Sequence, residues 1–298
     1  MGLECVARSH AMIAIGFALA SLAFAAALEV TYKRYAARER SRGMFVAGIG
    51  VVWGTMQALL WLQQARPLSW DITSVSFALA AGIAVAASNL LLIESLTHMD
   101  VSLGSTVYRL NTVVVVALSF VFLAESVGGM KLLAIGFGVA AALVLYHGTH
   151  HGLDLALARN FFWLAVLASV LRACFGVISK AALVHGVSYA TILLVSAACW
   201  VVGGLAYARY RERRVRITRD KLKYALLAGV LVFAVVNTLI WGLERGDAST
   251  VIPIANLSFV VALTVSVLWG MERFTPRKAL ATALAVVCIG LMSMTVSA

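Results

Sequence analysis

Charged residues and prolines are both scarce in this sequence. Only 12% of its 298 residues are Asp, Glu, Lys or Arg, against about 25% in a typical soluble domain, while 62% are hydrophobic. Of its three prolines, only Pro253 falls inside an apolar run. So few polar groups cannot cover a water-facing surface, which excludes a soluble globular protein. The chain is a membrane protein and divides into spans.

Cysteine pairs, metal motifs and catalytic motifs are also lacking. The four cysteines show no CxxC spacing, and three of them lie inside apolar runs, which excludes a disulfide framework. His147, His150 and His151 lie in a loop without a carboxylate cluster, so we expect no metal and no cofactor. The absence of HExxH, GxSxG, paired aspartates and a Walker motif argues against an enzyme and excludes an ATP-driven pump.

The excess of positive charge does not indicate a nucleic-acid partner. The formal charge is +11, but the Lys and Arg residues cluster in short loops between apolar runs, above all in 31–42 and 209–221. There they act as topology signals, because Lys and Arg favour the cytoplasmic face. The basic loops share one face, which places both termini outside. The first apolar run lacks a basic leader, so we interpret it as a retained helix.

Long apolar runs are what the sequence has in abundance. A helix needs about 20 apolar residues to cross a bilayer, and ten runs come close to that length. They are 11–30, 44–63, 72–94, 101–123, 131–147, 160–180, 189–208, 222–243, 249–271 and 278–297. The sequence therefore predicts an all-α polytopic membrane protein with ten transmembrane helices.

The stretch around Glu125 has a second copy around Glu272. With these two residues aligned, Lys131 meets Lys278 and the segment 102–111 meets 249–258. The chain is thus predicted to be two repeats, 1–147 and 160–298, joined by a linker at 148–159. Five spans in each repeat invert the second relative to the first, an arrangement of secondary transporters that places the site near the midplane.

These two copies carry a resemblance to a known family. Residues 101–146 and 247–294, each a polar-start helix followed by Glu, a short turn, a basic residue and a Gly- and Ala-rich helix, resemble the EamA family of the drug/metabolite transporter superfamily. The resemblance implies an inner-membrane carrier of small metabolites, with export favoured. The first span lacks the family's common Trp-Gly pair, and members are usually drawn with their termini inside.

Two arginines inside the spans are candidates for substrate binding. Arg172 lies twelve residues past Asn160, about 18 Å into the sixth span and near the bilayer centre, where a charge is costly unless it faces the protein interior. The alternative is a structural ion pair or bonds to carbonyls. Arg109 lies about 12 Å into the fourth span, and its alternative is snorkelling to the interface.

The polar neighbours of Arg109 have counterparts in the second copy. Tyr108 and Asn111 flank this arginine, and Asn256 lies at similar depth in the ninth span. Inverted repeats would bring the two polar patches towards one central cavity. Asn89 and Asn237 occupy matching places in the third and eighth spans. They are either substrate ligands or partners in interhelical hydrogen bonds.

Glu29 and Pro253 suggest how transport could be coupled to a conformational change. Glu29, near the end of the first span, could exchange a proton against substrate, as in the related small multidrug transporters, or pair with a basic residue of the next loop. Glu94 occupies a similar place in the third span. Pro253 breaks one backbone bond of the ninth span, which makes it either a hinge or a passive kink.

The sequence therefore predicts a secondary transporter of a small organic metabolite, such as an amino acid or an organic anion. Arginine in the spans favours a substrate with negative or zwitterionic charge. The alternatives are a flippase of lipids or lipid-linked carriers and a multidrug exporter. The expected partners are the substrate and the lipid bilayer, and the protein is expected to be a monomer or a homodimer.

Overall fold

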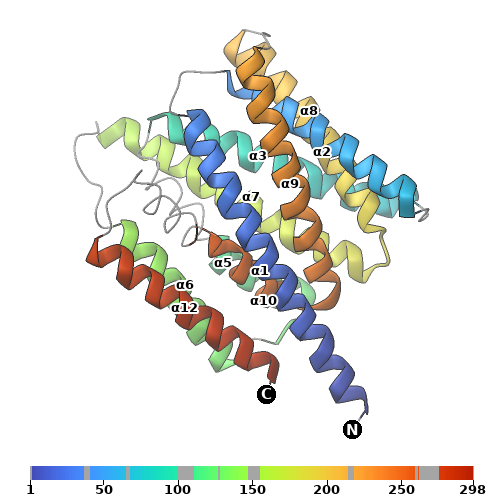
Figure 1. Cartoon of the computed structure of the whole chain (residues 1–298), viewed down its shortest axis with the longest axis vertical. Coiled ribbons are helices and arrows are strands. Elements are labelled where there is room, and N and C mark those ends of the chain that lie inside the picture. The colour runs from blue at the N-terminus through green and yellow to red at the C-terminus, as the bar shows by residue number, and fades with distance from the viewer. Residues whose placement is uncertain are drawn as a thin grey trace.

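The structure is a computed structural model that describes residues 2–36, 41–64, 68–98, 111–126, 128–146, 155–213, 218–258, 261 and 275–297. All regular elements in these ranges are helices (Figure 1). They are α1 (Gly2–Ala36), α2 (Arg42–Gln64), α3 (Ile72–His98), α5 (Asn111–Leu123), α6 (Gly129–Tyr146), α7 (Leu155–Val184), α8 (Tyr189–Tyr207), the π-helix η1 (Ala208–Glu212), α9 (Arg219–Arg245), α10 (Ala248–Asn256) and α12 (Pro276–Ser297).

Six of the described helices are long and apolar enough to cross a membrane: α1, α2, α3, α7, α8 with η1, and α9. Three shorter apolar segments lie in α5, α6 and α12. Each helix falls on one of the predicted runs. Parts of the runs 101–123 and 249–271 lie outside the described residues, so the number of ten spans stays a prediction. Helix α7 begins at Leu155, inside the stretch predicted as a linker.

Polar side chains fix the starts of two of these helices. The Asp71 carboxylate accepts hydrogen bonds from the backbone N and the hydroxyl of Ser74, at 3.0 and 2.6 Å, at the start of α3. These two bonds hold the pKa of Asp71 below its usual value. Thr218 accepts from Lys221 N at 3.4 Å at the start of α9. Both caps satisfy backbone N–H groups that have no partner within the helix.

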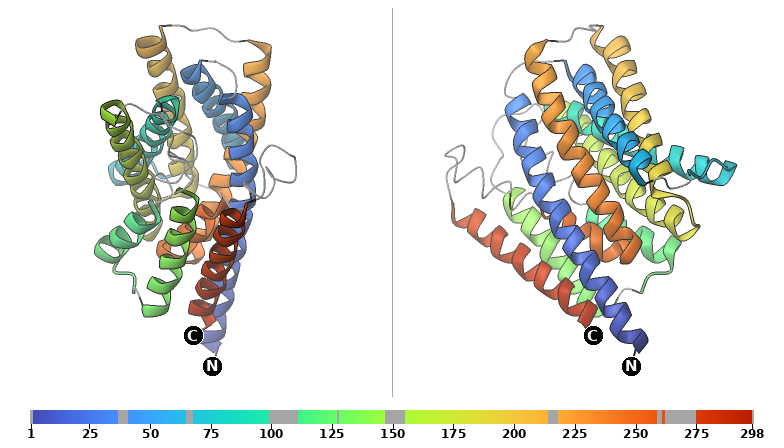
Figure 2. Two further views of the ribbon diagram at one scale, coloured as in Figure 1. Left: turned by 90° about the vertical axis from the view of Figure 1, so that its left-hand side faces the viewer. Right: turned by 45° about the vertical axis from the view of Figure 1, so that its right-hand side comes forward.

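The helices of the two halves are interleaved in a two-fold pattern. Helix α1 packs along α9, and α7, which occupies the same place in the second half, packs along α3. Helices α2 and α8 pair with each other, as do α6 and α12, which run side by side in Figures 1 and 2. Each half thus finds its main packing partners in the other half. Both termini lie at the same end of the bundle (Figure 1).

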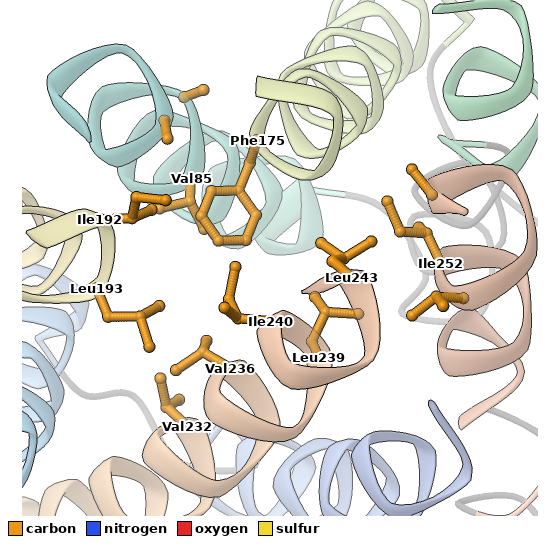
Figure 3. Packing of buried hydrophobic residues seen from close by; sticks show 14 of the residues in the cluster. Val85, Phe175, Ile192, Leu193, Val232, Val236, Leu239, Ile240, Leu243 and Ile252 are labelled. Carbon is orange, nitrogen blue, oxygen red and sulfur yellow. The ribbon is translucent and has the colours of Figure 1, made fainter. Parts of the chain in front are cut away.

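The main hydrophobic core draws residues from most helices of both halves, and a large part of it lies where α3, α7, α8, α9 and α10 meet. Figure 3 shows Phe175 of α7 facing Val85 of α3 and Ile240 of α9. Phe175 and Ile240 are buried almost completely, and most of the cluster is Val, Ile, Leu and Ala. Since both halves contribute, the core holds the repeats together.

Helices α2 and α8 approach each other closely through glycines. A Cβ atom at Gly204 would lie 2.5 Å from the backbone N of Ala47 and 2.8 Å from the carbonyl O of Gly43. A Cβ atom at Gly50 would lie 2.9 Å from Val201 N. Gly50 and Gly54 lie four residues apart, a spacing of small residues that is typical of close helix packing, and the contact at Gly50 fits this role.

Candidate functional site

Two asparagines from different halves meet where α5 crosses α10. Asn256 Nδ2 donates to Asn111 Oδ1 at 2.6 Å and to Thr112 Oγ1 at 3.1 Å. Asn111 and Thr112 are buried at the start of α5, while Asn256 is the last residue of α10. The polar patches expected to converge from the two repeats are therefore in direct contact at these residues.

Glu29 of α1 extends this polar centre by one more hydrogen bond. Ser258 Oγ, two residues beyond Asn256, donates to Glu29 Oε1 at 2.8 Å. Glu29 is half-buried, and Ser258 is buried. The carboxylate of the first half and the asparagine pair are thus linked through the short segment from Asn256 to Ser258.

Arg172 lies half-buried in α7, which packs against both α5 and α10. Its guanidinium group stands over the ring of Phe175, 5.5 Å from the ring centroid. No residue in the described part of the chain forms an ion pair with it. The alternative interpretation as a structural ion pair therefore finds no support among the described residues.

The matched asparagines of α3 and α9 have different partners. Asn237 Nδ2 donates across helices to Gln57 Oε1 of α2 and also to Phe233 O, each at 2.8 Å. Asn89 Nδ2 donates to Val85 O of its own helix at 2.9 Å. The predicted interhelical hydrogen bond is thus present at Asn237. Gln57 was not predicted as a candidate, although a polar residue inside an apolar run was the available signal.

Several buried polar atoms around Gln57 have no hydrogen-bond partner among the described residues. They are Trp53 Nε1, Gln57 Nε2, Ser196 Oγ, Trp200 Nε1 and Asn237 Oδ1. The rings of Trp53 and Trp200 pack edge to face, with centroids 5.8 Å apart. Because such atoms are usually satisfied, water or a polar solute is the natural partner for this second polar centre.

Polar contacts join the two halves at the end of the bundle with the basic loops. The Glu94 carboxylate accepts from the Tyr207 hydroxyl, lies 3.1 Å from Arg211 Nη2 and lies 3.7 Å from Arg42 Nη1. Glu212 Oε1 accepts from the backbone N of Arg42 at 2.6 Å. Glu94 therefore belongs to an interfacial network, separate from the hydrogen bonds described for Glu29.

At the opposite end of the bundle, which carries both termini, Glu125 joins the two halves. Its carboxylate accepts from the backbone N of Ala248 at 2.8 Å and of Ser249 at 2.9 Å, and also from the Ser249 hydroxyl. This negative group from the first half caps the N-terminus of α10 in the second half. Lys180 Nζ donates to two carbonyls at the C-terminal end of α9, at 2.7 and 2.8 Å.

Three predicted site residues differ in what the structure says of them. Tyr108 and Arg109 lie outside the described residues. Pro253 is buried in α10, three residues before Asn256, and has no N–H to donate to the carbonyl of Ser249. Its role as a hinge stays a prediction. No group of three or more metal-ligating side chains occurs in the described ranges.

The arrangement suits binding and carrying more than covalent chemistry. An arginine without an ion pair can bind a carboxylate, and the amides can donate to and accept from an uncharged group. These groups come from both halves and lie where the halves meet.

Comparison with known proteins identifies the family. The model of the EamA-like transporter family matches residues 12–147 and again 161–294. The chain belongs to the EamA-like transporter family. The two matches make it a tandem of two EamA repeats, and family membership implies a transporter of the drug/metabolite type in a lipid bilayer.

Solved structures support the fold alone. One crystal structure of another protein superposes with a TM-score of 0.78 at 15% identity, covering 97% of this chain and 98% of that one. No curated protein matches the chain.

Proposed function

We propose that this EamA protein is a secondary active transporter that exports a small organic solute bearing a carboxylate or another anionic group. The substrate binds between the two repeats, in contact with Arg172 and the asparagine pair Asn111–Asn256. The observation that carries the proposal is the half-buried Arg172, which has no ion pair in the described part of the chain.

The energetics of a charge inside a membrane protein support this role for Arg172. A charge near the bilayer centre costs about 2.5–3.5 kcal/mol on insertion scales, so one without a partner points to a ligand or to water. Guanidinium binds carboxylate through two parallel hydrogen bonds. A bound anion would supply the missing charge, and the contact with Phe175 keeps the guanidinium in place.

The proposed topology is ten spans in two inverted repeats, with both termini outside. The two-fold pairing of α1 with α9 and of α7 with α3 supports the relation between the repeats. The concentration of Lys and Arg in the loops 31–42 and 209–221 supports the orientation. A cysteine added at the C-terminus should be labelled by an impermeant maleimide in intact cells. Labelling only after permeabilisation would reverse the orientation.

Alternating access is the proposed mechanism. Polar contacts join the halves at both ends of the bundle, through Glu94 and Arg211 at one end and through Glu125 and Ser249 at the other. A carrier must release one set of contacts while keeping the other, so that the central site faces one side at a time. In the proposed cycle, Glu29 exchanges a proton when the solute leaves.

Transport by the purified protein in proteoliposomes tests this proposal. Amino acids, organic anions and cationic drugs are first screened by thermal shift, and a stabilising compound is then used as a labelled solute. Arg172→Gln should lower uptake at low solute concentration about 10- to 100-fold, the value of one charged hydrogen-bonded contact. Arg209→Gln, which changes an exposed arginine of η1, is the matched control.

Transport that is unaffected by Arg172→Gln would remove this residue from the site. Movement of a labelled phospholipid with no movement of any soluble compound would instead indicate a lipid flippase. Transport of cationic drugs alone would indicate a multidrug exporter, because a cation gains nothing from arginine.

A further inference from the structure

A polar pocket, separate from the groups around Asn256 and around Gln57, opens at the end of the bundle that carries both termini. It has a volume of about 470 Å³ and lies between the first turns of the α1 span, the turn from α5 to α6 and the turn from α9 to α10. This volume falls within the usual range of small-molecule sites, about 300–1,000 Å³. The candidate spans of α1 and α9 begin and end here, at His10 and Arg245, so the pocket lies at a membrane boundary.

Charged groups of both signs line this pocket. Lys131 of α6 is buried, and its Nζ lies 3.1 Å from Asp247 Oδ2 and 3.4 Å from Ser126 O. The Asp247 side chain is 52% exposed. Arg245 of α9 adds a second cation, which is partly exposed and stands over the ring of Phe17 at 5.3 Å. Its Nη1 also lies 3.2 Å from Glu244 Oε2, a carboxylate outside the pocket lining. Two cations and one carboxylate thus surround a space of solute size.

Small residues keep the space between these charges open. A Cβ atom added at Gly128 or Gly129 would meet no atom of the described residues within 4 Å, so the space beside these two glycines is open. At the opposite wall, Gly246 lets the α9–α10 turn approach α1, because a Cβ atom there would lie 2.7 Å from Ala14 Cβ. Ile15 and Val251 make part of the lining apolar.

We propose that this pocket is an outer binding site for a small zwitterion with an apolar side chain. The carboxylate of the ligand lies between Lys131 Nζ and the Arg245 guanidinium, its ammonium group binds Asp247, and its side chain lies against Ile15 and Val251. The ligand separates Lys131 from Asp247 and replaces one ion pair by two.

The charge balance selects this class over its simpler analogues. A plain carboxylate gains the two cations but faces Asp247 without neutralising it. A plain amine gains Asp247 but faces two cations. Only a ligand that carries both charges places an opposite charge against each of the three charged groups of the lining, since like charges at contact are unfavourable.

The pocket lies at the outer end of the proposed export route, and to that extent the inference rests on the proposed function. Asp247 directly precedes α10, the helix whose N-terminus is capped by Glu125 and whose last residue, Asn256, belongs to the central polar centre. A solute bound in the pocket therefore contacts the same short helix that reaches the central site.

The test uses the purified full-length protein in nanodiscs and three probes of one shape. L-Leucine carries both charges, 4-methylvalerate lacks the ammonium group and isoamylamine lacks the carboxylate. Isothermal titration should show L-leucine binding at least about 10-fold more tightly than either analogue. Asp247→Asn should reduce the affinity for L-leucine to that for 4-methylvalerate while leaving binding of 4-methylvalerate no weaker.

Two further variants distinguish a specific loss of ligand binding from a loss caused by misfolding. Arg245→Gln should weaken L-leucine and 4-methylvalerate equally, because both present a carboxylate to this residue. Arg209→Gln should change neither. Failure of L-leucine to bind wild type, equal binding of L-leucine and 4-methylvalerate, or an affinity ratio untouched by Asp247→Asn would each overturn the inference.

The inference and the proposed function can fail separately. Transport that depends on Arg172, with no binding of L-leucine that depends on Asp247, overturns the outer site and leaves the transporter standing. Binding of L-leucine that depends on Asp247, with no transport of any solute, supports the pocket and counts against the proposed function.

Discussion

Asn111 and Asn256 lie 145 residues apart in sequence, yet Asn256 Nδ2 donates to Asn111 Oδ1 at 2.6 Å. They start α5 and end α10, so one hydrogen bond connects the polar centres of both repeats. In the proposed alternating-access cycle, this bond lies across the interface between the two halves that move.

The first prediction concerns the energy of this bond. Asn111→Ala and Asn256→Ala should each lower the stability of the purified protein, and the double variant should cost less than their sum. The expected coupling is about 0.5–1.5 kcal/mol, the range for a hydrogen bond between neutral groups. Denaturant unfolding followed by tryptophan fluorescence measures it, and strict additivity would show that the two amides act independently.

The second prediction concerns Glu29 and the coupling of transport to protons. Glu29→Gln keeps an acceptor for the Ser258 hydroxyl but cannot release a proton. Exchange of labelled for unlabelled solute should therefore persist, whereas accumulation driven by a pH gradient should be lost. Asp220→Asn, at an exposed carboxylate in the first turn of α9, is the control. A Glu29→Gln protein that still accumulates solute with the pH gradient excludes Glu29 as the coupling group.

The third prediction concerns the cap that Glu125 provides for α10. Glu125→Ala leaves the backbone N–H groups of Ala248 and Ser249 without their acceptor. Each buried donor left unsatisfied costs about 1–3 kcal/mol, so the unfolding temperature should fall clearly. Ser126→Ala, at the exposed neighbour, should change it little. Equal unfolding temperatures for both variants would mean that α10 needs no cap.

The fourth prediction uses two adjacent glycines of α8. Gly204→Ala forces a methyl group to within 2.5 Å of backbone atoms of α2 and should destabilise the protein by about 1–3 kcal/mol. Gly203→Ala meets nothing nearer than 3.5 Å and should be neutral or stabilising, by up to about 1 kcal/mol, because alanine favours the helix. Thermal unfolding in detergent distinguishes them. If both variants behave alike, the close approach of α2 and α8 does not limit stability.

Much of the fold could be predicted from the sequence, because membrane helices are marked by continuous apolar length. The predicted run 222–243 lies within α9 (Arg219–Arg245), and the run 189–208 matches α8 to within one residue. The helix boundaries were harder to place. Helix α7 begins at Leu155 because the segment LALAR is itself a good helix former, although it lies in the stretch predicted as a linker.

The candidate site was predictable only in part. Polar residues such as Arg172, Asn237 and Asn256 stand out in apolar runs, so they could be named without a structure. Which of them touch depends on how helices cross, and the sequence does not contain that information directly. Gln57 was missed for this reason, since its role is defined by its partner Asn237 in another helix.

The interleaving of the two halves has a consequence for how the protein is made. Helix α1 packs along α9 and α3 along α7, so the helices of the first half are made before their main partners are synthesised. Native packing must wait until the ribosome has nearly finished the chain, which favours slow folding through non-local contacts. In that interval Glu29 and Asn111 lack Ser258 and Asn256, the partners that they bind across the two halves in the folded protein.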